Sequence, residues 1–491
     1  MLDTLIPSTA RQTGLLNTIK PHTPSSHVAA SDEEPLDDGA WSAAQTAAPS
    51  RKTNHAALLR RVEELSGGRE PLETPATRLH GYGLRNDPQN EVGAAYMIID
   101  KLPGRPFDSG VASEEQKSIV PNSSTMVTRM HNSLVVMNPR APYEIRQYPT
   151  VSPAGDEILV HVKWTASTPF DLHQADGGLL VESPQRTGAA AAGVVVEVGP
   201  DVKHFKVGDR VFGYAHYQPN WKAHQEYATA PEWVFGKVYP RQIFDGASRY
   251  ENFITAFHTI STDLELPTPW PKPEGYVPSR ADDHILIWGA ASSVGQFTIS
   301  VLKFYGYHHV IATASPRHHE YLKQQGAEGC FDYRSPTVVD DLLKKYQKGD
   351  GPAFPLIVDC IGSQAGSFGS VGRVSKIAQN GTTVAVMLPI ILKQATDGEA
   401  PEYSLDANSS AQWAEGTSVR GVRTHFYLQN ELSKQKLQTE IMPQMLAAGH
   451  VVPNRYRVIE GRDLLERATK ALILLRRGVS GEKLVWRVSE E

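Results

Sequence analysis

The chain has 491 residues, enough for two or three domains, and its 49 basic and 54 acidic side chains give a formal net charge of −5. The basic residues are scattered, which excludes the dense positive charge typical of proteins that bind nucleic acids or anionic membranes. Only two cysteines, Cys330 and Cys360, occur, so a disulfide scaffold and a cysteine-rich zinc site are excluded as well.

Hydropathy predicts a soluble, cytoplasmic protein. No apolar run approaches the roughly 20 residues that a membrane-spanning helix needs. The first residues also lack the charged and apolar regions of a secretory signal. The scarcity of cysteine agrees with a reducing compartment.

Residues 1–78 are rich in Ser, Thr, Ala, Pro and charged side chains and poor in aromatic ones. Such a stretch buries too little apolar area to offset the entropy lost on ordering, so we expect a disordered extension. One short helix is predicted within it, at residues 56–65.

Residues 79–118, with Glu91 to Pro106 at their centre, resemble a short part of the aminoglycoside-phosphotransferase family, a late strand and the hinge of a kinase-like fold. No catalytic-loop His-Gly-Asp and no metal-binding Asp comes after them, and phosphoryl transfer needs those carboxylates. We therefore interpret residues 79–125 as a kinase-like remnant and linker without kinase activity. Met126 or Met130 is a natural start for the next domain.

From residue 126 to 245 the pattern changes to short strands separated by Gly, Asp and Pro, which predicts a small β-barrel-like domain. The turn from Val207 to Gly213 leads into another strand. The predicted strands are Ser133–Met137, Glu144–Tyr148, Glu157–Trp164, Gly193–Gly199 and Glu226–Pro231.

Residues 246–425 alternate strands with helices, which predicts an α/β fold with a doubly wound, parallel Rossmann sheet. A helix is expected at Ala247–Asp263, before a Pro-rich loop. The predicted strands are His284–Trp288, His309–Ser315, Cys330–Tyr333, Pro355–Cys360 and Thr382–Leu388. Residues 426–491 contain an amphipathic helix at Asp463–Arg477 and a strand at Glu482–Val488, which we expect to return to the barrel.

A glycine-rich turn joins the strand that ends at Trp288 to the next helix. Backbone N–H groups at such a turn, and the positive end of the helix dipole, bind a pyrophosphate. Ala291 replaces the second glycine of the usual fingerprint, but the strand–turn–helix–strand setting strengthens the prediction. The expected cofactor-binding residues of the turn are Gly289, Ala291, Ser292, Ser293, Val294 and Gly295.

The end of the second strand favours NADPH over NADH. An Asp or Glu there holds the ribose 2′-hydroxyl of NAD, whereas this chain has Ser315, Arg317 and His318 and no carboxylate before Glu320. A hydroxyl followed by a guanidinium suits a dianionic 2′-phosphate. The alternative is that Arg317 merely begins a solvated helix.

The region from about residue 126 to 491 resembles the medium-chain dehydrogenase/reductase superfamily, through its barrel strands and turn, its nucleotide-binding turn, Gly326–Glu328 and Ser480–Val485. Within it the chain looks most like the fungal trans-acting enoyl reductases of the lovastatin type, and quinone oxidoreductases share much of the pattern. The resemblance implies a GroES-like catalytic barrel with a Rossmann NADP-binding domain. It also implies a polyketide synthase as partner in secondary metabolism and an oligomeric state of monomer or homodimer.

The same resemblance excludes a catalytic zinc. Zinc-dependent relatives have Cys where this chain has Thr168, and Gly-His-Glu where it has Gly188, Ala189 and Ala190. A catalytic zinc needs about three His, Cys or carboxylate ligands, and alanine provides none. The four-cysteine structural lobe is absent too.

Further site residues are implied by the resemblance. Thr168 and Asp171 match the loop beside the nicotinamide, with Thr168 as donor to carboxamide or substrate; capping of the next helix is the alternative for Asp171. Tyr333 is expected at the adenine, and Ser480 and Gly481 at the C-terminal turn that reaches the cofactor. The stretch expected to line the substrate cleft contains Tyr250, Asn252, Phe253, Thr255 and Phe257, with Tyr250 also a candidate proton donor.

The leading hypothesis is therefore an NADPH-dependent, zinc-independent reductase of the C=C bond in α,β-unsaturated carbonyl compounds, small or carrier-bound. Hydride adds to the β-carbon and hydrogen-bond donors stabilise the enolate. A quinone oxidoreductase with the same cofactor is the enzymatic alternative. A cofactor-binding scaffold protein without turnover is the alternative from another class.

Overall fold

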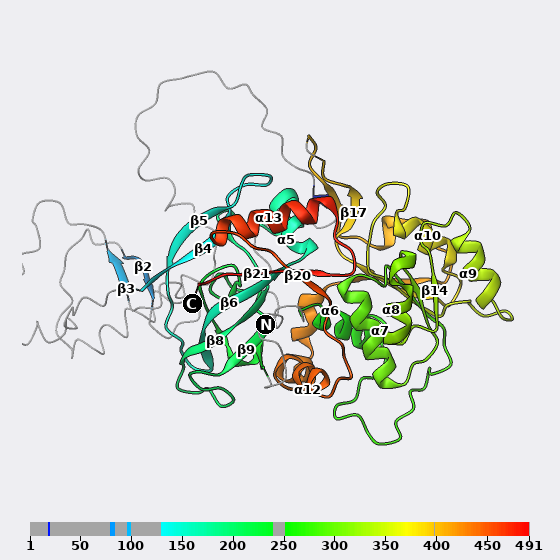
Figure 1. The fold of residues 1–491 in the computed structure, drawn as a ribbon, viewed down its shortest axis with the longest axis horizontal. Helices are drawn as coiled ribbons and strands as arrows, with labels where there is room; N and C mark the ends of the chain where they lie inside the picture. Colours follow the sequence, from blue (N-terminus) through cyan, green and yellow to red (C-terminus); the bar gives the residue numbers. More distant parts are fainter. Residues whose placement is uncertain are drawn as a thin grey trace, which may run out of the picture. The chain divides into compact units, whose positions relative to one another are not determined.

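The computed structural model of the chain is drawn in Figure 1, and the helix expected at 56–65 lies outside the residues that it describes. The chain divides into two compact units, residues 1–22 with 127–491, and residues 23–126. In the second unit, β2 (Leu79–Gly83) pairs antiparallel with β3 (Tyr96–Ile99). The described residues are 18–19, 79–83, 96–99, 129–238, 251–396 and 398–490.

A seven-stranded, mostly antiparallel sheet forms the barrel-like part of the larger unit. Its central strand β6 changes partner along one edge: Glu157–His161 pair with β10 and Trp164–Ser167 pair with β21. The strands predicted here from alternation are all present, so the barrel prediction is confirmed. The sheet contains β6 (Glu157–Ser167), β8 (Ala190–Val198), β9 (Arg210–Tyr214), β10 (Tyr227–Pro231), β11 (Phe235–Lys237), β20 (Tyr456–Val458) and β21 (Lys483–Arg487).

A smaller sheet and two helices complete this part. The sheet has the order β5 (Glu144–Pro149), β4 (Met130–Val136), β7 (Gln185–Arg186). Helix α5 (Pro169–Gly177) contacts α13 (Leu464–Arg477), as Figure 1 shows. Two short 3₁₀ turns, η1 (Pro219–Trp221) and η2 (Glu232–Val234), connect the strands.

The second part of this unit is a six-stranded parallel sheet with the order β14–β13–β12–β15–β16–β19. Numbered by their sequence order within the sheet, its strands run 3-2-1-4-5-6, the doubly wound arrangement. The α/β prediction is therefore confirmed, and β19 is a sixth strand that the sequence pattern did not predict. The strands are β12 (Ile285–Trp288), β13 (Val310–Thr313), β14 (Gly329–Phe331), β15 (Leu356–Asp359), β16 (Thr383–Met387) and β19 (Ser418–Val422).

Both faces of this sheet are buried, because successive strand residues point to opposite sides. Ile285 and Ile287 join the core beneath α6 and α7, whereas Leu286 and Trp288 join the core beneath α9 and α10. The helices are α6 (Glu251–His258), α7 (Ser293–Tyr305), α8 (His319–Gln325), α9 (Val338–Tyr346) and α10 (Ser370–Ile377), with π-helical η4 (Thr259–Asp263) after α6 and 3₁₀ turn η5 (Pro316–His318) before α8.

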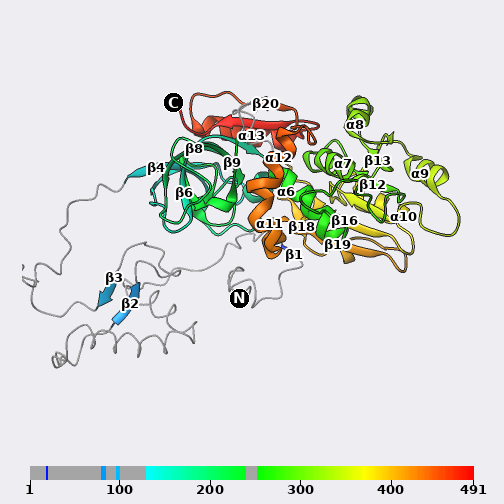
Figure 2. The same cartoon turned by 90° about the horizontal axis from the view of Figure 1, so that it is seen from below.

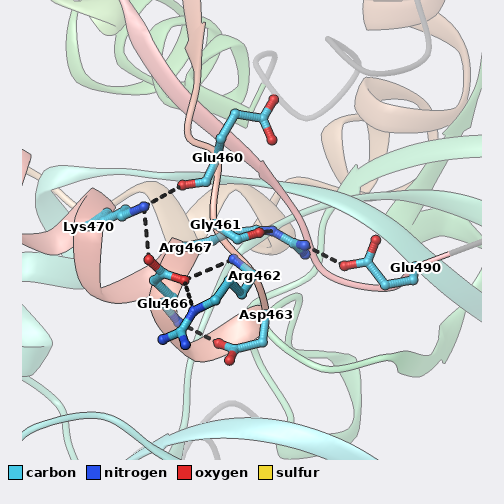
Figure 3. Close-up of polar contacts among 8 residues, drawn as sticks. All are labelled: Glu460, Gly461, Arg462, Asp463, Glu466, Arg467, Lys470 and Glu490. Atoms are coloured by element: carbon cyan, nitrogen blue, oxygen red, sulfur yellow. Dashed lines mark hydrogen bonds and ion pairs between the residues drawn. The ribbon is translucent and has the colours of Figure 1, made fainter.

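The C-terminal helix and strand return to the barrel, as the sequence predicts: β21 pairs with β6, and α13 lies near the barrel strands (Figure 2). Asp463 caps α13 by accepting a hydrogen bond from the backbone N–H of Glu466 at 2.8 Å. Figure 3 shows the surrounding ion pairs of Glu466 with Arg462 and Lys470, and of Arg467 with Glu490. These pairs hold the start of the helix against the loop before it and the chain end.

The remaining elements lie between β16 and β20, apart from β1 (Thr18–Ile19), which pairs with β18. β1 lies in the stretch 1–78 that composition predicts to be largely disordered, and its two residues pair with an edge strand that offers them backbone partners. No helix among the described residues is both long and apolar enough to cross a bilayer. The elements are β17 (Ile390–Lys393), β18 (Glu402–Ser404), η6 (Asn408–Ser410), η7 (Thr424–Gln429), α11 (Glu431–Lys436), η8 (Leu437–Ile441) and α12 (Met442–Ala447).

Candidate cofactor and active site

The glycine-rich turn between β12 and α7 has the geometry that its glycines predict. Gly289 has φ of +75°, and a Cβ there would lie 2.4 Å from Cγ1 of Ile361. A Cβ on Gly295 would lie 2.6 Å from Cα of Ala290. Both positions therefore need glycine, one for its backbone conformation and for space, the other for close packing of helix on turn.

The start of α7 is prepared to bind an anion. Ser292 caps the helix, because its Oγ accepts a hydrogen bond from the N–H of Gly295 at 3.1 Å. The other amides of a first helical turn have no partner within the helix and carry the positive end of its dipole. The carbonyl of Ala291 accepts a hydrogen bond from Nε2 of Gln296 at 2.8 Å, and this bond restricts the backbone of the turn. Val294 packs against the core on the helix side.

The end of β13 meets the C-terminal turn, as predicted. Nε2 of His318 lies 3.0 Å from Oγ of Ser480 and accepts a hydrogen bond from Nε of Arg317 at 3.1 Å. Gly481 has φ of +79°, and a Cβ there would lie 2.5 Å from Cε1 of His318. Ser315 is buried directly before these residues. Predicted cofactor residues from two distant parts of the chain are therefore neighbours.

A positively charged cavity of about 410 Å³ lies at this junction. Arg317, Arg455, Arg457 and Arg477 line it, and Glu482 forms an ion pair with Arg457. Burial lowers the pKa of His318, and the nearby guanidinium groups of Arg317 and Arg455 lower it further. The cavity favours an anion.

Asn454 is a site residue that sequence reasoning missed. It is 1% exposed; its Oδ1 accepts a hydrogen bond from Oγ of Ser293, and its Nδ2 donates to Oε1 of Gln296 at 3.0 Å. Ser293 is thus a turn residue whose hydroxyl is already engaged. In the sequence Asn454 is marked only by a preceding proline and a short strand after it, and that signal is too weak to predict the contact.

Thr168 and Asp171 form a capping box at the start of α5. Oδ2 of Asp171 accepts hydrogen bonds from the N–H of Thr168 at 2.7 Å and from its Oγ1 at 3.3 Å. Both residues are buried, and burial raises the pKa of Asp171 to about 6 against the opposing effect of these hydrogen bonds. The capping alternative for Asp171 is confirmed, and its effect on the site is to hold the hydroxyl of Thr168.

Two buried lysines near this box were not predicted, nor was a buried histidine beside Thr187. Lys222 and Lys483 act on the carboxylate of Asp171 through their charges. Burial lowers the pKa of Lys222 to about 8, and its ammonium group donates to the carbonyl of His216. Nδ1 of His224 lies 3.0 Å from Oγ1 of Thr187, and burial lowers its pKa to about 3.

The positions at which zinc-dependent relatives have ligands hold Thr168, Ala189 and Ala190, and both alanines are buried. In the part of the chain that the structure describes, no three His, Cys, Asp or Glu side chains meet in a group that would hold a metal ion. The hydroxyl of Thr168 donates to Asp171, and the two alanines have no ligand atoms. These three residues therefore do not fit a catalytic zinc.

The predicted substrate stretch lies on α6, and Tyr250 lies outside the described residues. Phe253 and Phe257 are buried, with their rings 6.0 Å from Phe297 and 6.5 Å from Tyr305 between α6 and α7. The structure gives both rings core contacts, so their contact with substrate stays a prediction.

Two polar residues of α6 also stay predictions as substrate contacts. Oγ1 of Thr255 accepts a hydrogen bond from Oγ1 of Thr424 at 3.0 Å, and Asn252 is partly exposed. Tyr333, just after β14, packs edge-on against Phe368 at 6.0 Å, and its contact with adenine is likewise a prediction.

Comparison with known proteins places these features in a family. The alcohol dehydrogenase GroES-like domain matches residues 154–249. The trans-enoyl reductase himH of Aspergillus japonicus is 30% identical over 344 residues, which cover 68% of this chain and 90% of himH. The chain belongs to the trans-enoyl reductase family. It is an oxidoreductase of the medium-chain dehydrogenase/reductase type, so the resemblance inferred from its motifs is confirmed.

Two further similarities agree with this family assignment. The enoyl reductase component lovC of the lovastatin nonaketide synthase, from Aspergillus terreus, is 26% identical over 349 residues, covering 68% of this chain and 89% of lovC. Escherichia coli quinone oxidoreductase complexed with NADPH shares the fold, with a TM-score of 0.54 at 18% identity over 72% of this chain and 99% of its own. The matches give no support to the kinase-like resemblance of residues 79–118.

Proposed function

We propose that this protein reduces the C=C bond of α,β-unsaturated carbonyl compounds with NADPH and without zinc, and that its substrates are enoyl chains, free or bound to a carrier protein. The observation that carries the proposal is the joined anion site. A glycine turn at the start of α7 and a cavity lined by Arg317 and three further arginines are linked by one segment, residues 454–457. NADPH carries negative charge at two matching places, on its pyrophosphate and on its 2′-phosphate.

When bound, NADPH would supply a hydride for the β-carbon of the enoyl substrate. The chain's own residues would bind and orient it. The amides of the turn would hold the pyrophosphate, and Arg317 would donate charge-assisted hydrogen bonds to the 2′-phosphate. Thr168 donates its hydroxyl hydrogen to Asp171 at 3.3 Å, and as a catalytic donor it would exchange this contact for the carbonyl oxygen of the substrate, where negative charge develops.

The absence of donors at Ala189 and Ala190 supports zinc independence. A reductase that works on an activated C=C bond needs no metal to lower a hydroxyl pKa. The carbonyl already draws charge from the β-carbon, so positioning and hydrogen bonding are sufficient.

A turnover screen tests the proposal. NADPH oxidation is followed with enones, crotonyl-type thioesters and quinones, each with and without a chelator. We expect turnover of the thioesters, unchanged by the chelator. Turnover of quinones alone would contradict the enoyl proposal in favour of a quinone oxidoreductase, and NADPH binding without any turnover would show a scaffold protein.

The cellular setting follows from the same proposal. A trans-acting enoyl reductase works on chains carried by a polyketide synthase in the cytoplasm, as part of fungal secondary metabolism. Adding a carrier-bound enoyl chain to the screen tests this, because a carrier partner lowers KM relative to a small thioester. Gel filtration distinguishes monomer from homodimer.

A further inference from the structure

The segment that leads from the loop after α12 into β20 touches both ends of the predicted cofactor site. Asn454 contacts the turn at the start of α7, and its neighbour Arg455 lines the arginine-rich cavity. Arg457, two residues on, lines the same cavity and pairs with Glu482. This segment belongs to the C-terminal return and is remote in sequence from the βαβ unit that normally holds the nucleotide.

Asn454 restricts the glycine-rich turn at the start of α7 through hydrogen bonds. It accepts from Ser293 and donates to Gln296, and Gln296 in turn donates to the carbonyl of Ala291. This chain of hydrogen bonds is buried, since Asn454 is 1% and Gln296 is 2% exposed. Buried hydrogen bonds of this kind restrict the backbone that must face the pyrophosphate.

Arg455, which lines the cavity, also contacts an aromatic ring. Its guanidinium carbon lies 4.1 Å from the ring centre of Tyr321 on α8, a stacking arrangement that orients the planar group. It is exposed and lines the same cavity as His318, whose imidazole Arg317 also contacts, and its charge lowers the pKa of His318. Two guanidinium groups, from distant parts of the chain, therefore face one His318–Ser480 pair.

We propose that Asn454 and Arg455 are a second arm of the cofactor site: Asn454 positions the pyrophosphate-binding turn, and Arg455 is a specificity-determining residue that binds the 2′-phosphate together with Arg317. The inference rests on the proposed use of NADPH. It adds that cofactor selectivity is shared between the nucleotide-binding unit and the C-terminal return. The two residues have different effects, because one acts on a group common to all dinucleotides and the other on a group that only NADPH carries.

Binding of NADP⁺ and of NAD⁺ to the full chain, measured by calorimetry, tests the proposal without requiring turnover. Arg455→Ala should weaken NADP⁺ about tenfold and change NAD⁺ less than about twofold, because it removes a charge-assisted contact to the 2′-phosphate alone. Arg146→Ala is the matched control, since Arg146 is an exposed, ion-paired arginine on β5 outside the cavity. It should change neither affinity.

Asn454→Ala should weaken NADP⁺ and NAD⁺ by the same factor, about tenfold, because both carry the pyrophosphate. If that variant fails to fold in a thermal melt, Asn454→Asp replaces it, which keeps the acceptor for Ser293, loses the donor to Gln296 and gives the same pattern. Equal losses of both nucleotides in Arg455→Ala, or no loss, would overturn the role of Arg455. A loss of NADP⁺ affinity alone in the Asn454 variant would overturn its role.

Failure of the proposed function gives a different result. If the two variants change NADP⁺ and NAD⁺ binding as expected but the wild-type protein reduces no enoyl substrate, the inference stands and the enoyl proposal falls. If it binds neither nucleotide, both are wrong.

Discussion

Arg317 and Asp171 are charged residues that the sequence offers for the site, and the structure gives them opposite surroundings. Arg317 is exposed at the edge of a cavity, beside His318 and Ser480. Asp171 is 3% exposed, and its carboxylate accepts the hydrogen bonds of the capping box at the start of α5. One side chain is therefore available to a ligand, whereas the other acts through Thr168.

Arg317→Ala should raise KM for NADPH about tenfold or more and leave KM for NADH nearly unchanged, because a hydrogen bond to a charged group contributes about 1.5–3 kcal/mol. The rate at saturating NADPH should change little. Initial rates with the two cofactors check this. Arg317→Lys is the control; it keeps the charge but loses the forked geometry and should give an intermediate KM. Equal increases for both cofactors would contradict the placement of the 2′-phosphate.

Asp171→Asn tests the buried carboxyl. Burial raises the folded-state pKa of Asp171 from 3.8 to about 6, so the folded protein holds a proton that the unfolded chain releases between these values. Stability supplied by this group is therefore lost as pH rises from about 4 to 6, on the order of 3 kcal/mol. The free energy of unfolding of Asp171→Asn, measured with urea, should rise relative to that of the wild type between pH 4 and pH 7. If the difference between the two free energies is the same at every pH, the pKa of Asp171 is not raised.

At the scale of the element, two helical glycines give a matched pair. Gly295 in α7 faces the backbone of Ala290, whereas Gly372 in α10 has no atom within 4 Å of a built Cβ. Gly295→Ala should destabilise the fold by about 1–3 kcal/mol and weaken NADPH binding, since the helix must move off the turn. Gly372→Ala should stabilise it by about 0.5–1 kcal/mol. Thermal melts and cofactor titrations measure both, and equal effects would contradict the packing argument.

The elements that the sequence predicts are those with a clear period or a fixed turn. The strands of the barrel, the β12–α7 turn and the α13–β21 return all carry such signals, and all are present. The hairpin of β17 and β18 and the three-residue β20 are too short to show a period. The contacts of Asn454 and Arg455 could not be predicted for the same reason, because they depend on where β20 lies.

At the scale of the molecule, the barrel and the C-terminal return are tied together by polar contacts as well as by strand pairing. Asp176 on α5 accepts two hydrogen bonds from Arg476 on α13, at 2.6 and 2.9 Å. Asp176 is 3% exposed. A buried carboxylate paired in this way is costly to leave alone, so the two helices depend on each other.

Buried and partly buried histidines make the fold sensitive to acid. Burial lowers their folded-state pKa values below 6.5, so unfolding takes up protons and the stability present above pH 6.5 is lost as pH falls through the folded values. The raised pKa values of Asp171 and Asp263, about 6 and 7, oppose this, but fewer groups contribute. Two of these histidines are buried, His258 with pKa about 4 and His224 with pKa about 3, and two are partly buried, His173 and His425, both with pKa about 4.

The free energy of unfolding should therefore fall between pH 6.5 and pH 5, measured by urea unfolding at closely spaced pH values. His224→Gln should make that dependence shallower by about one proton, or about 1.4 kcal/mol per pH unit, because an amide keeps a partner for Thr187 without titrating. His309→Gln, at an exposed histidine paired with Glu328, is the control and should leave the slope nearly unchanged. An unchanged slope in His224→Gln would show that this imidazole keeps an ordinary pKa in the folded protein.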